Sequence, residues 1–175
     1  ALSEAMARNG QGAEGLAREL NSYFAQMVRL ISSDGGDVCK FAGDAMIVLW
    51  PPGNDDMTLR LRRATQCAIA IQEYLNSAEL EPGVSLSVKI GIGYGTVNIL
   101  HIGGMYNRME FLPVGDPLLQ AFQAEHHAAN GGEIIVSAQS WSLIEEFFNA
   151  EHVFEDGYIR LDWHEDFQNV RKQSR

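Results

Sequence analysis

The sequence predicts an α+β fold, in which helices lie on one face of a mostly antiparallel sheet. Two observations lead to this prediction. Apolar residues recur at helical spacing in long segments, and these segments alternate with short β-rich runs bounded by Gly, Pro, Asn and Asp. Several β-rich runs also follow one another at hairpin spacing. The 175 residues show no linker or internal repeat, so residues 1–175 are expected to form one domain.

The first part of the chain is predicted to form a helix and a hairpin. Residues 10–15 contain three glycines and are expected to form a loop, and Gly35-Gly36 ends the helix that follows. Strands are expected at 38–41 and 45–50, with a tight turn at Ala42-Gly43-Asp44 between them. The apolar stripe of the helix contains Leu16, Leu20, Tyr23, Phe24, Met27 and Ile31.

A second helix and the remaining elements follow from the same signals. Asn54, Asp55, Asp56 and Thr58 offer capping side chains before a stripe of Ala64, Cys67, Ala68, Ile71 and Leu75. Pro82-Gly83 interrupts the chain before a strand at 84–92. Two more strands are expected at 97–102 and 109–114, joined by a loop at Gly103-Gly104. A helix at 118–129, ended by Asn130-Gly131-Gly132, and a strand at 133–136 should follow. The last expected elements are a helix capped by Ser137 that contains Trp141, Ile144 and Phe148, a strand at 158–161, and a polar tail after Trp163.

Charge and composition exclude several classes of function. With 13 Lys+Arg against 23 Asp+Glu, the formal net charge is −10, which disfavours binding to nucleic acid or to anionic membranes. No apolar run approaches the roughly 18 residues of a membrane span, and the first residues do not read as a signal peptide. Cys39 and Cys67 read as free thiols in a reducing compartment. We therefore expect a cytoplasmic protein.

The hairpin tip Lys40-Phe41-Ala42-Gly43-Asp44 is the first candidate site. A carboxylate in a tight turn, next to a glycine, suits a hard cation such as Mg²⁺. The alternative is an aspartate that hydrogen-bonds its own backbone, and spacing alone favours this alternative.

The glycine run Gly91-Ile92-Gly93-Tyr94-Gly95 is not a dinucleotide-binding motif, because no helix opens after it. We expect the glycines either to let a strand bend or to let it approach a partner's backbone closely. Lys89 is expected to point away from Val88 and Ile90, either toward a ligand or simply into solvent. All five histidines are expected to be surface or hydrogen-bonded residues rather than metal ligands.

Three ordered motifs resemble the catalytic domain of the class III nucleotidyl cyclases, most closely the first of the two catalytic domains of soluble, bicarbonate-responsive adenylyl cyclases. They are Phe41-Ala42-Gly43-Asp44-Ala45 with its closing Trp50, then Val88-Lys89-Ile90-Gly91-Ile92, then Phe111-Leu112-Pro113-Val114-Gly115. The resemblance implies a ferredoxin-like βαββαβ core with extra C-terminal strands and a helix. It further implies that the first strand of that core is missing from the chain.

The resemblance also implies an activity and a set of site residues. The family converts ATP to cyclic AMP and pyrophosphate at the interface of two catalytic domains, with two aspartates holding Mg²⁺ or Mn²⁺. Asp44 corresponds to the second of these aspartates. Lys89 falls where a basic residue contacts the substrate phosphates, and Phe41 and Gly43 belong to the nucleotide loop. The other metal aspartate would lie on the missing strand.

Two departures from the family pattern restrict this implied activity. Self-sufficient cyclases place an Asn and an Arg where this chain has Leu119 and Gln123, and neither can stabilise a charged transition state. A second, degenerate pocket would contain Lys40, Leu112 and Phe122, where a lysine without a partnering arginine is a weak anion site. We expect that pocket to be inert.

The sequence therefore predicts the metal-binding half of an adenylyl cyclase, inactive alone, whose partners are ATP and a second cyclase domain that covers an exposed apolar face. The competing hypothesis is a catalytically inactive docking or regulatory domain of the same fold. A diguanylate cyclase is excluded, because Gly35-Gly36-Asp37 ends a helix instead of forming a hairpin tip. A preference for GTP over ATP stays open, because the base-selecting residues would lie mostly on the partner.

Overall fold

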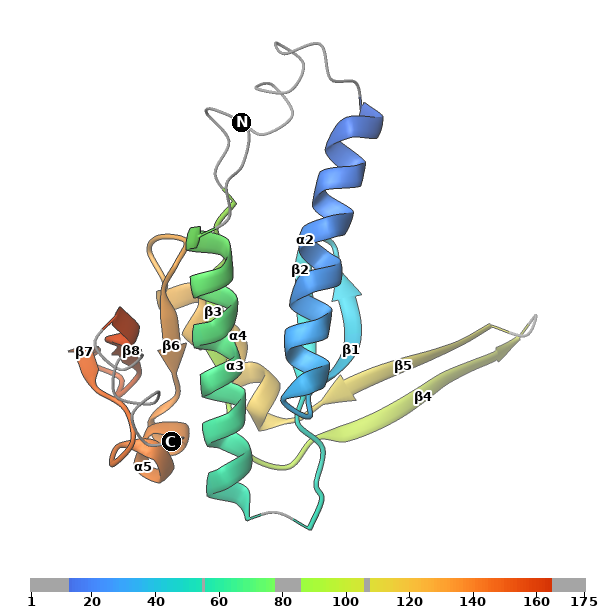
Figure 1. Cartoon of the computed structure of the whole chain (residues 1–175). Coiled ribbons are helices and arrows are strands. Elements are labelled where there is room, and N and C mark those ends of the chain that lie inside the picture. Colours follow the sequence, from blue (N-terminus) through green and yellow to red (C-terminus); the bar gives the residue numbers. More distant parts are fainter. Residues whose placement is uncertain (1–12, 55, 78–85, 106–107, 165–175) are drawn as a thin grey trace.

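The computed structural model describes residues 13–54, 56–77, 86–105 and 108–164 (Figure 1). The predicted α+β class is confirmed, with long helices packed on short strands. Among the described residues, no helix is both long and apolar enough to cross a bilayer. The elements are α2 (Ala13–Ser33), β1 (Asp37–Ala42), β2 (Ala45–Leu49), α3 (Met57–Ser77), β3 (Ile90–Ile92), β4 (Asn98–Met105), β5 (Arg108–Val114), α4 (Asp116–His127), β6 (Ile134–Val136), α5 (Ala138–Ile144), β7 (Ala150–Val153) and β8 (Ile159–Leu161).

Hydrogen bonds join the described strands into three sheets instead of the expected single one. Two are antiparallel hairpins, β1-β2 and β4-β5, and the third has the strand order β3-β6-β8-β7. Within the third sheet β3 and β6 run parallel, whereas the other pairs are antiparallel. Among the described residues, β2 and β3 are each paired along one edge only.

The four-stranded sheet is covered on both faces, so the expectation of helices on a single face is wrong. Ile134 and Val136 of β6 pack with Leu61 and Ala68 of α3. Ile135, between them, instead packs with Ala124 of α4 and with Ala128, the residue that follows this helix. Because successive strand residues point to opposite faces, α3 and α4 lie on opposite sides of the sheet.

A second core joins α2 and α3 to the β1-β2 hairpin. Met27 and Ile31 of α2 are buried together with Cys67, Ile71 and Leu75 of α3. Val38, Met46, Val48 and Trp50 of the hairpin pack against this cluster, as do Leu86 and Val88 of the segment before β3. This core therefore fixes the hairpin that carries Asp44 relative to the rest of the domain.

The β4-β5 hairpin extends away from the body of the domain (Figure 1), and we call it the arm. Its register pairs Leu100 with Leu112 and His101 with Phe111. Successive residues of a strand point to opposite faces. Because apolar residues stand next to one another in both β4 and β5, apolar side chains occupy both faces of the arm. Most of them are exposed: Ile99, Leu100, Ile102, Met109, Phe111 and Leu112.

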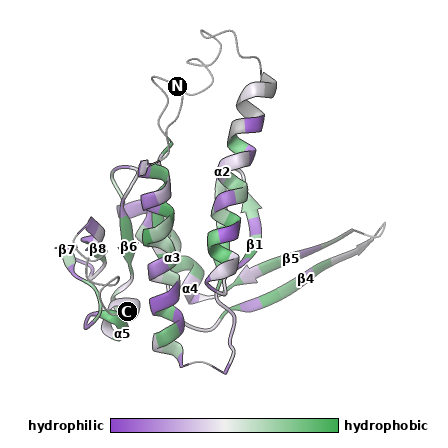
Figure 2. Cartoon of the chain, viewed as in Figure 1, coloured by the Kyte–Doolittle hydropathy of each residue, from purple (hydrophilic) through white to green (hydrophobic). Residues whose placement is uncertain are grey.

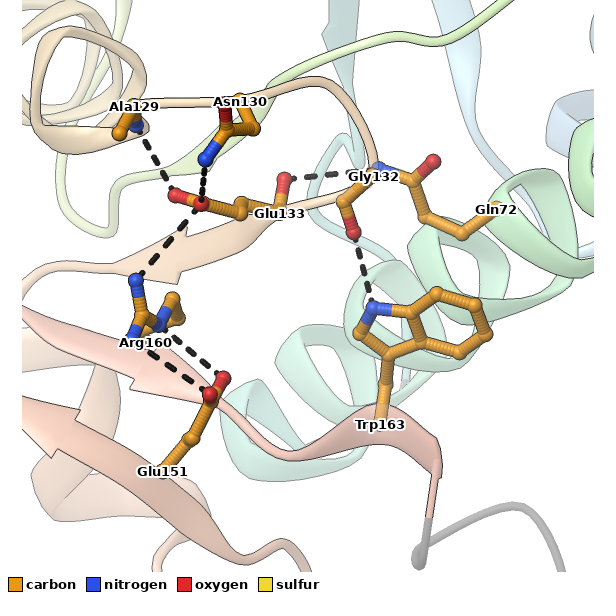
Figure 3. Close-up of polar contacts among 8 residues, drawn as sticks. All are labelled: Gln72, Ala129, Asn130, Gly132, Glu133, Glu151, Arg160 and Trp163. Carbon is orange, nitrogen blue, oxygen red and sulfur yellow. Dashed lines mark hydrogen bonds and ion pairs between the residues drawn. The ribbon is translucent and has the colours of Figure 1, made fainter.

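Polar contacts fix the start of β6 between α3, α4 and β8 (Figure 3). The side chain of Glu133 accepts hydrogen bonds from the amide of Ala129 at 3.0 Å and from Nδ2 of Asn130 at 3.3 Å. Arg160 of β8 lies 3.6 Å from the same carboxylate and 3.0 Å from Glu151 of β7. Nε1 of Trp163 donates to the carbonyl of Gly132 at 2.9 Å.

Several boundaries in the first part of the chain differ from the sequence prediction. The loop expected at 10–15 is wrong for its last residues, because α2 begins at Ala13. The predicted glycine stop is confirmed, since Gly35 has a φ of +83°. Thr58 lies inside α3 instead of capping it. Residues 10–12, Asp55, Pro82-Gly83, the start of the strand expected at 84–92, and nearly all of the polar tail lie outside the described residues.

Later boundaries also shift. Of the strand expected at 84–92, the described part forms β3 at Ile90–Ile92 only. The loop predicted at Gly103-Gly104 is wrong, because β4 continues to Met105. The helix expected at 118–129 begins two residues earlier, and the exposed strand β7 was not predicted. The Ser137 cap is confirmed, because its hydroxyl accepts a hydrogen bond from the amide of Ser140.

Candidate functional site

Asp44 lies at the tip of the β1-β2 hairpin, in a two-residue turn shorter than the three residues expected. Ala42 pairs with Ala45, so only Gly43 and Asp44 form the turn. Gly43 has a φ of +66°, a conformation that two-residue hairpin turns need and that glycine adopts without a steric cost. Asp44 is exposed, and a Cβ on Gly43 would meet no atom within 4 Å. The tip is therefore open to a ligand.

Phe41 anchors this hairpin to α2. Its ring contacts that of Phe24 edge to face, with centroids 6.0 Å apart, which is a favourable aromatic geometry. Half of the Phe41 side chain nevertheless stays exposed. Phe41 thus lies beside the open tip, partly packed against α2 and partly exposed. Its role in a nucleotide loop stays a prediction.

Lys40 is engaged in an ion pair, and the second pocket expected around it stays a prediction. Its Nζ donates to Oε2 of Glu110, on β5 of the arm, at 3.0 Å. Leu112 is two residues further along β5 and therefore points to the same face of the arm as Glu110. Phe122 is exposed on α4. Sequence reasoning missed Glu110, because a contact across 70 residues leaves no local signal.

Lys89 is exposed, between the half-buried Val88 and Ile90, as the alternation predicted. It lies in the segment that leads into β3, whereas Asp44 lies on the separate β1-β2 hairpin. Lys89 thus precedes a strand of one sheet, whereas Asp44 belongs to another sheet. The phosphate contact of Lys89 stays a prediction.

Close backbone contacts hold α4 against β3, as the glycine run predicted. A Cβ on Gly91 would collide with the carbonyl oxygen of Ala121 and lie 2.6 Å from the amide nitrogen of Glu125. A Cβ on Gly93 would collide with the carbonyl oxygen of Pro117. Since only glycine lacks a Cβ, these positions allow the helix to lie directly on the strand.

Helix α4 carries Leu119 and Gln123, the two positions at which this chain departs from the pattern of self-sufficient cyclases. Leu119 is exposed and apolar, as is Phe122 on the same helix. The side chain of Gln123 is engaged within the domain, because its Oε1 accepts a 2.7 Å hydrogen bond from the hydroxyl of Tyr158. Neither Leu119 nor Gln123 therefore offers a positive charge to a phosphate.

The exposed apolar residues are concentrated on the arm and on α4. Figure 2 shows hydrophobic stretches along both β4 and β5. Exposed patches of this kind mark interaction surfaces in soluble proteins. The predicted apolar face is thus present, although what covers it stays a prediction.

Potential metal ligands are sparse in the part of the chain that the structure describes. It contains no group of three or more His, Cys, Asp and Glu side chains that could hold a metal ion. The exposed Asp44 carboxylate fits a cation such as Mg²⁺ as one oxygen ligand, but the remaining ligands would have to come from elsewhere. His127 is a satisfied residue as expected, with Nε2 2.8 Å from Oδ2 of Asp156 and its ring between Phe154 and Tyr158.

Cys67 is a buried, free thiol. The pKa of the Cys67 thiol is raised from 9.0 to about 12, mainly by burial and in addition by the charge of the neighbouring Asp34 carboxylate and a hydrogen bond to it. A thiol with this pKa is protonated at neutral pH and therefore unreactive. Cys39 is half-buried in β1, and both cysteines are free.

Comparisons with known proteins agree with this geometry. Residues 2–160 match the family described as the adenylate and guanylate cyclase catalytic domain. The adenylate cyclase type 10 of Rattus norvegicus is 31% identical over 133 residues, which is 76% of this chain and 8% of that protein. The chain thus spans a small part of the curated relatives that it matches.

Solved cyclase domains share the fold. The adenylyl cyclase CyaB of P. aeruginosa superposes with a TM-score of 0.70 at 21% identity, covering 91% of this chain and 87% of that one. A dimeric guanylyl cyclase domain of the RhoGC fusion protein from the fungus Blastocladiella emersonii gives a TM-score of 0.73 at 19% identity, covering 90% and 87%.

Proposed function

The chain belongs to the adenylate and guanylate cyclase catalytic domain family, and from this premise we propose that it is the metal-binding half of an adenylyl cyclase. A second, complementary cyclase domain completes the site, and the chain is inactive alone. The observation that carries this proposal is that the chain has the aspartate expected to bind metal but lacks the donors that would stabilise the transition state. Asp44 stands at an open hairpin tip, whereas Leu119 and Gln123 occupy the α4 positions at which a self-sufficient domain would need polar and charged donors.

The reaction is an internal phosphoryl transfer. The ribose 3′-oxygen of ATP forms a bond to the α-phosphorus, the bond from that phosphorus to the oxygen of the β-phosphate breaks, and the hydroxyl proton is released. Cyclic AMP and pyrophosphate result. Mg²⁺ or Mn²⁺, when bound, supplies charge neutralisation at the phosphates and lowers the pKa of the attacking hydroxyl.

The chain's own residues position the substrate in this scheme. The Asp44 carboxylate holds the cation, and the nucleotide loop at Phe41 and Gly43 leaves room for the triphosphate. Lys89 contributes a positive charge toward the phosphates. The partner domain supplies the base pocket and the groups that stabilise the transition state. Its contact surface is the apolar area formed by the arm together with Leu119 and Phe122.

ATP is the favoured substrate over GTP, because the matching curated relatives include several proteins named adenylate cyclase. The alternative function is a docking or regulatory domain without catalysis. The observation that favours it is the exposed apolar surface of the arm, which a docking domain would use without any need for catalysis.

The test uses this protein, mixed with the second catalytic domain of a soluble adenylyl cyclase. Cyclic AMP and cyclic GMP are measured from ATP and GTP with Mg²⁺ or Mn²⁺. Asp44→Asn should lower cyclic AMP production by at least about 100-fold, because even changes to residues behind a metal ligand cost 10–100-fold. Asp37→Asn is the matched control, since Asp37 is exposed at the opposite end of β1.

Loss of activity in Asp44→Asn alone supports the proposal. No cyclic nucleotide in any mixture, despite a folded protein that associates with the second domain, would favour the docking function. Cyclic GMP as the main product would overturn the substrate and leave the half-site arrangement intact.

A further inference from the structure

The ion pair between Lys40 and Glu110 connects two hairpins that share no sheet. Lys40 belongs to β1 and Glu110 to β5, and the β1-β2 and β4-β5 hairpins are separate two-stranded sheets. Nζ and Oε2 are 3.0 Å apart, a charge-assisted hydrogen-bond distance. The pair therefore links the hairpin that carries Asp44 to the arm that carries the exposed apolar residues.

Lys40 is well placed to control the position of the Asp44 turn. It pairs with Ile47, and only two further residue pairs separate it from the turn. The register of β1 shifts between Val38 and Lys40, and such a bulge is a natural bending point in a hairpin. The ion pair lies beyond this bulge, in the same part of the hairpin as the Phe41–Phe24 contact, and adds a link from this part to the arm.

Glu110 is equally well placed to respond to a partner on the arm. It pairs with Ile102 across the arm and is flanked in sequence by Met109 and Phe111, all three of them exposed. Side-chain exposure is 33% for Lys40 and 74% for Glu110. An ion pair exposed to this degree is weak in water. A partner domain that covers the arm takes both charges out of water, so that leaving either one unpaired becomes costly and the paired arrangement is favoured.

The charge of Lys40 matters for the cation as well. Lys40 is the basic residue closest in sequence to Asp44, and an unpaired ammonium near the turn would repel a divalent cation. Pairing with Glu110 neutralises it. A strengthened pair therefore both steadies the turn and removes this repulsion.

We propose that the Lys40–Glu110 pair couples the two binding events of the domain, so that a partner on the arm and a divalent cation at Asp44 each favour the binding of the other. Lys40 and Glu110 are then positioning residues that act through the Asp44 turn. The inference rests on the proposed function, because that function supplies the partner and the cation. Coupling of this kind is reciprocal: each ligand changes the affinity of the other by the same factor.

Two binding measurements test the coupling without reference to catalysis. Mn²⁺ binding to this protein is followed by electron paramagnetic resonance, with and without the second catalytic domain of a soluble adenylyl cyclase. Binding of that domain is measured by calorimetry, with and without Mn²⁺. In the wild type we expect both affinities to rise by the same factor, about fivefold or more.

Glu110→Gln and Lys40→Gln should each reduce this factor to less than about twofold, and the double variant should reduce it no further, as expected for a single interaction. Glu146→Gln, which removes an exposed carboxylate near the end of α5, is the control and should keep the wild-type factor. Circular dichroism establishes that each variant is folded. If one single variant does not fold, the other and the double variant still carry the test.

An unchanged factor in folded Glu110→Gln overturns the inference, and if cyclic AMP is still produced, the proposed function stands. A reduced factor without any cyclic nucleotide supports the inference and counts against the proposed activity. If the second domain does not bind the wild type, the inference is overturned, because it requires a partner on the arm.

Discussion

The hydroxyl of Tyr158 donates a 2.7 Å hydrogen bond to Oε1 of Gln123, across 35 residues of sequence. This bond ties α4 to the residue that leads into β8. Gln123 stands at the position where the resemblance to self-sufficient cyclases would place an arginine. The glutamine thus has a structural task inside the domain, which agrees with a half-site in which the partner stabilises the transition state.

Tyr158→Phe should lower the free energy of unfolding by about 1 kcal/mol, the usual net contribution of such a bond. Burial raises the pKa of Tyr158, and the nearby Asp156 charge raises it further. A raised pKa stabilises the folded state fully below the ordinary value of 10.0, and this stabilisation is lost as pH rises through the folded-state pKa. Urea unfolding at pH 8 and above pH 10 should therefore show the difference between the two proteins shrinking.

Gly43→Ala should destabilise the protein by about 1–2 kcal/mol, because alanine pays a steric cost at the left-handed φ of +66°. Gly43→Asn should cost less, since asparagine tolerates this conformation. Gly53→Ala is the control: a Cβ there also meets no atom within 4 Å and Gly53 lacks a positive φ. Equal stabilities of the two alanine variants in urea would contradict the role given to the Gly43 backbone.

Gly91→Ala should be more damaging than Gly43→Ala, because its Cβ collides with the backbone of α4 at Ala121. Backbone cannot rotate away as a side chain can, and inserting atoms into a packed region typically costs about 1–3 kcal/mol or more. Thermal unfolding gives the magnitude. Amide chemical shifts in α4 should move as well, and an unperturbed α4 would show that the contact is not as tight as described.

Cys67 should resist alkylation while Cys39 reacts. The pKa of Cys67 is raised to about 12 by burial, so little thiolate exists at pH 8. Iodoacetamide labelling followed by mass spectrometry should modify Cys39 first and Cys67 only after unfolding. Because the folded-state pKa is the higher one, the thiol stabilises the fold fully below pH 9.0 and loses this contribution as pH rises toward 12.

Met109→Asp on the arm should weaken association with a second cyclase domain by about tenfold or more, because it places a charge in an apolar contact. Stability in urea should change by less than about 0.5 kcal/mol, since the side chain is exposed. Val153→Asp on β7 is the control, being at least as exposed and outside the arm. Sedimentation velocity measures the association, and equal weakening by both variants would place the interface elsewhere.

The sequence predicted what depends on local chemistry. The glycine stop at Gly35, the presence of a tight turn at Gly43 (though one residue shorter than predicted) and the serine cap at Ser137 each follow from the preference of one residue for one backbone geometry. All five residues of the predicted α3 stripe are buried, because helical spacing fixes which side chains share a face. The buried face is wider than predicted, since it also includes Leu61, Thr65, Ile69 and Gln72.

The missed features depend on contacts between distant segments. Strand β7 is short and exposed, with Glu151 and His152 in it, so it carries no apolar alternation and forms by pairing with β8. The partner of Lys40 lies 70 residues away. The covering of both sheet faces required knowing that Ile134, Ile135 and Val136 are all buried in a parallel pair, whose strands are apolar on both sides.

The parallel pairing of β3 with β6 also orders the events of folding. The two hairpins close over short loops and should form within microseconds. Pairing of Ile90 with Ile134 instead closes a much longer loop, which contains the whole arm and α4. This closure costs more conformational entropy. We therefore expect the arm to form, with its apolar side chains uncovered, before the central sheet is complete. A nascent chain would pass through a state in which its interaction surface exists but its scaffold does not, and early capture by a partner would protect it from aggregation.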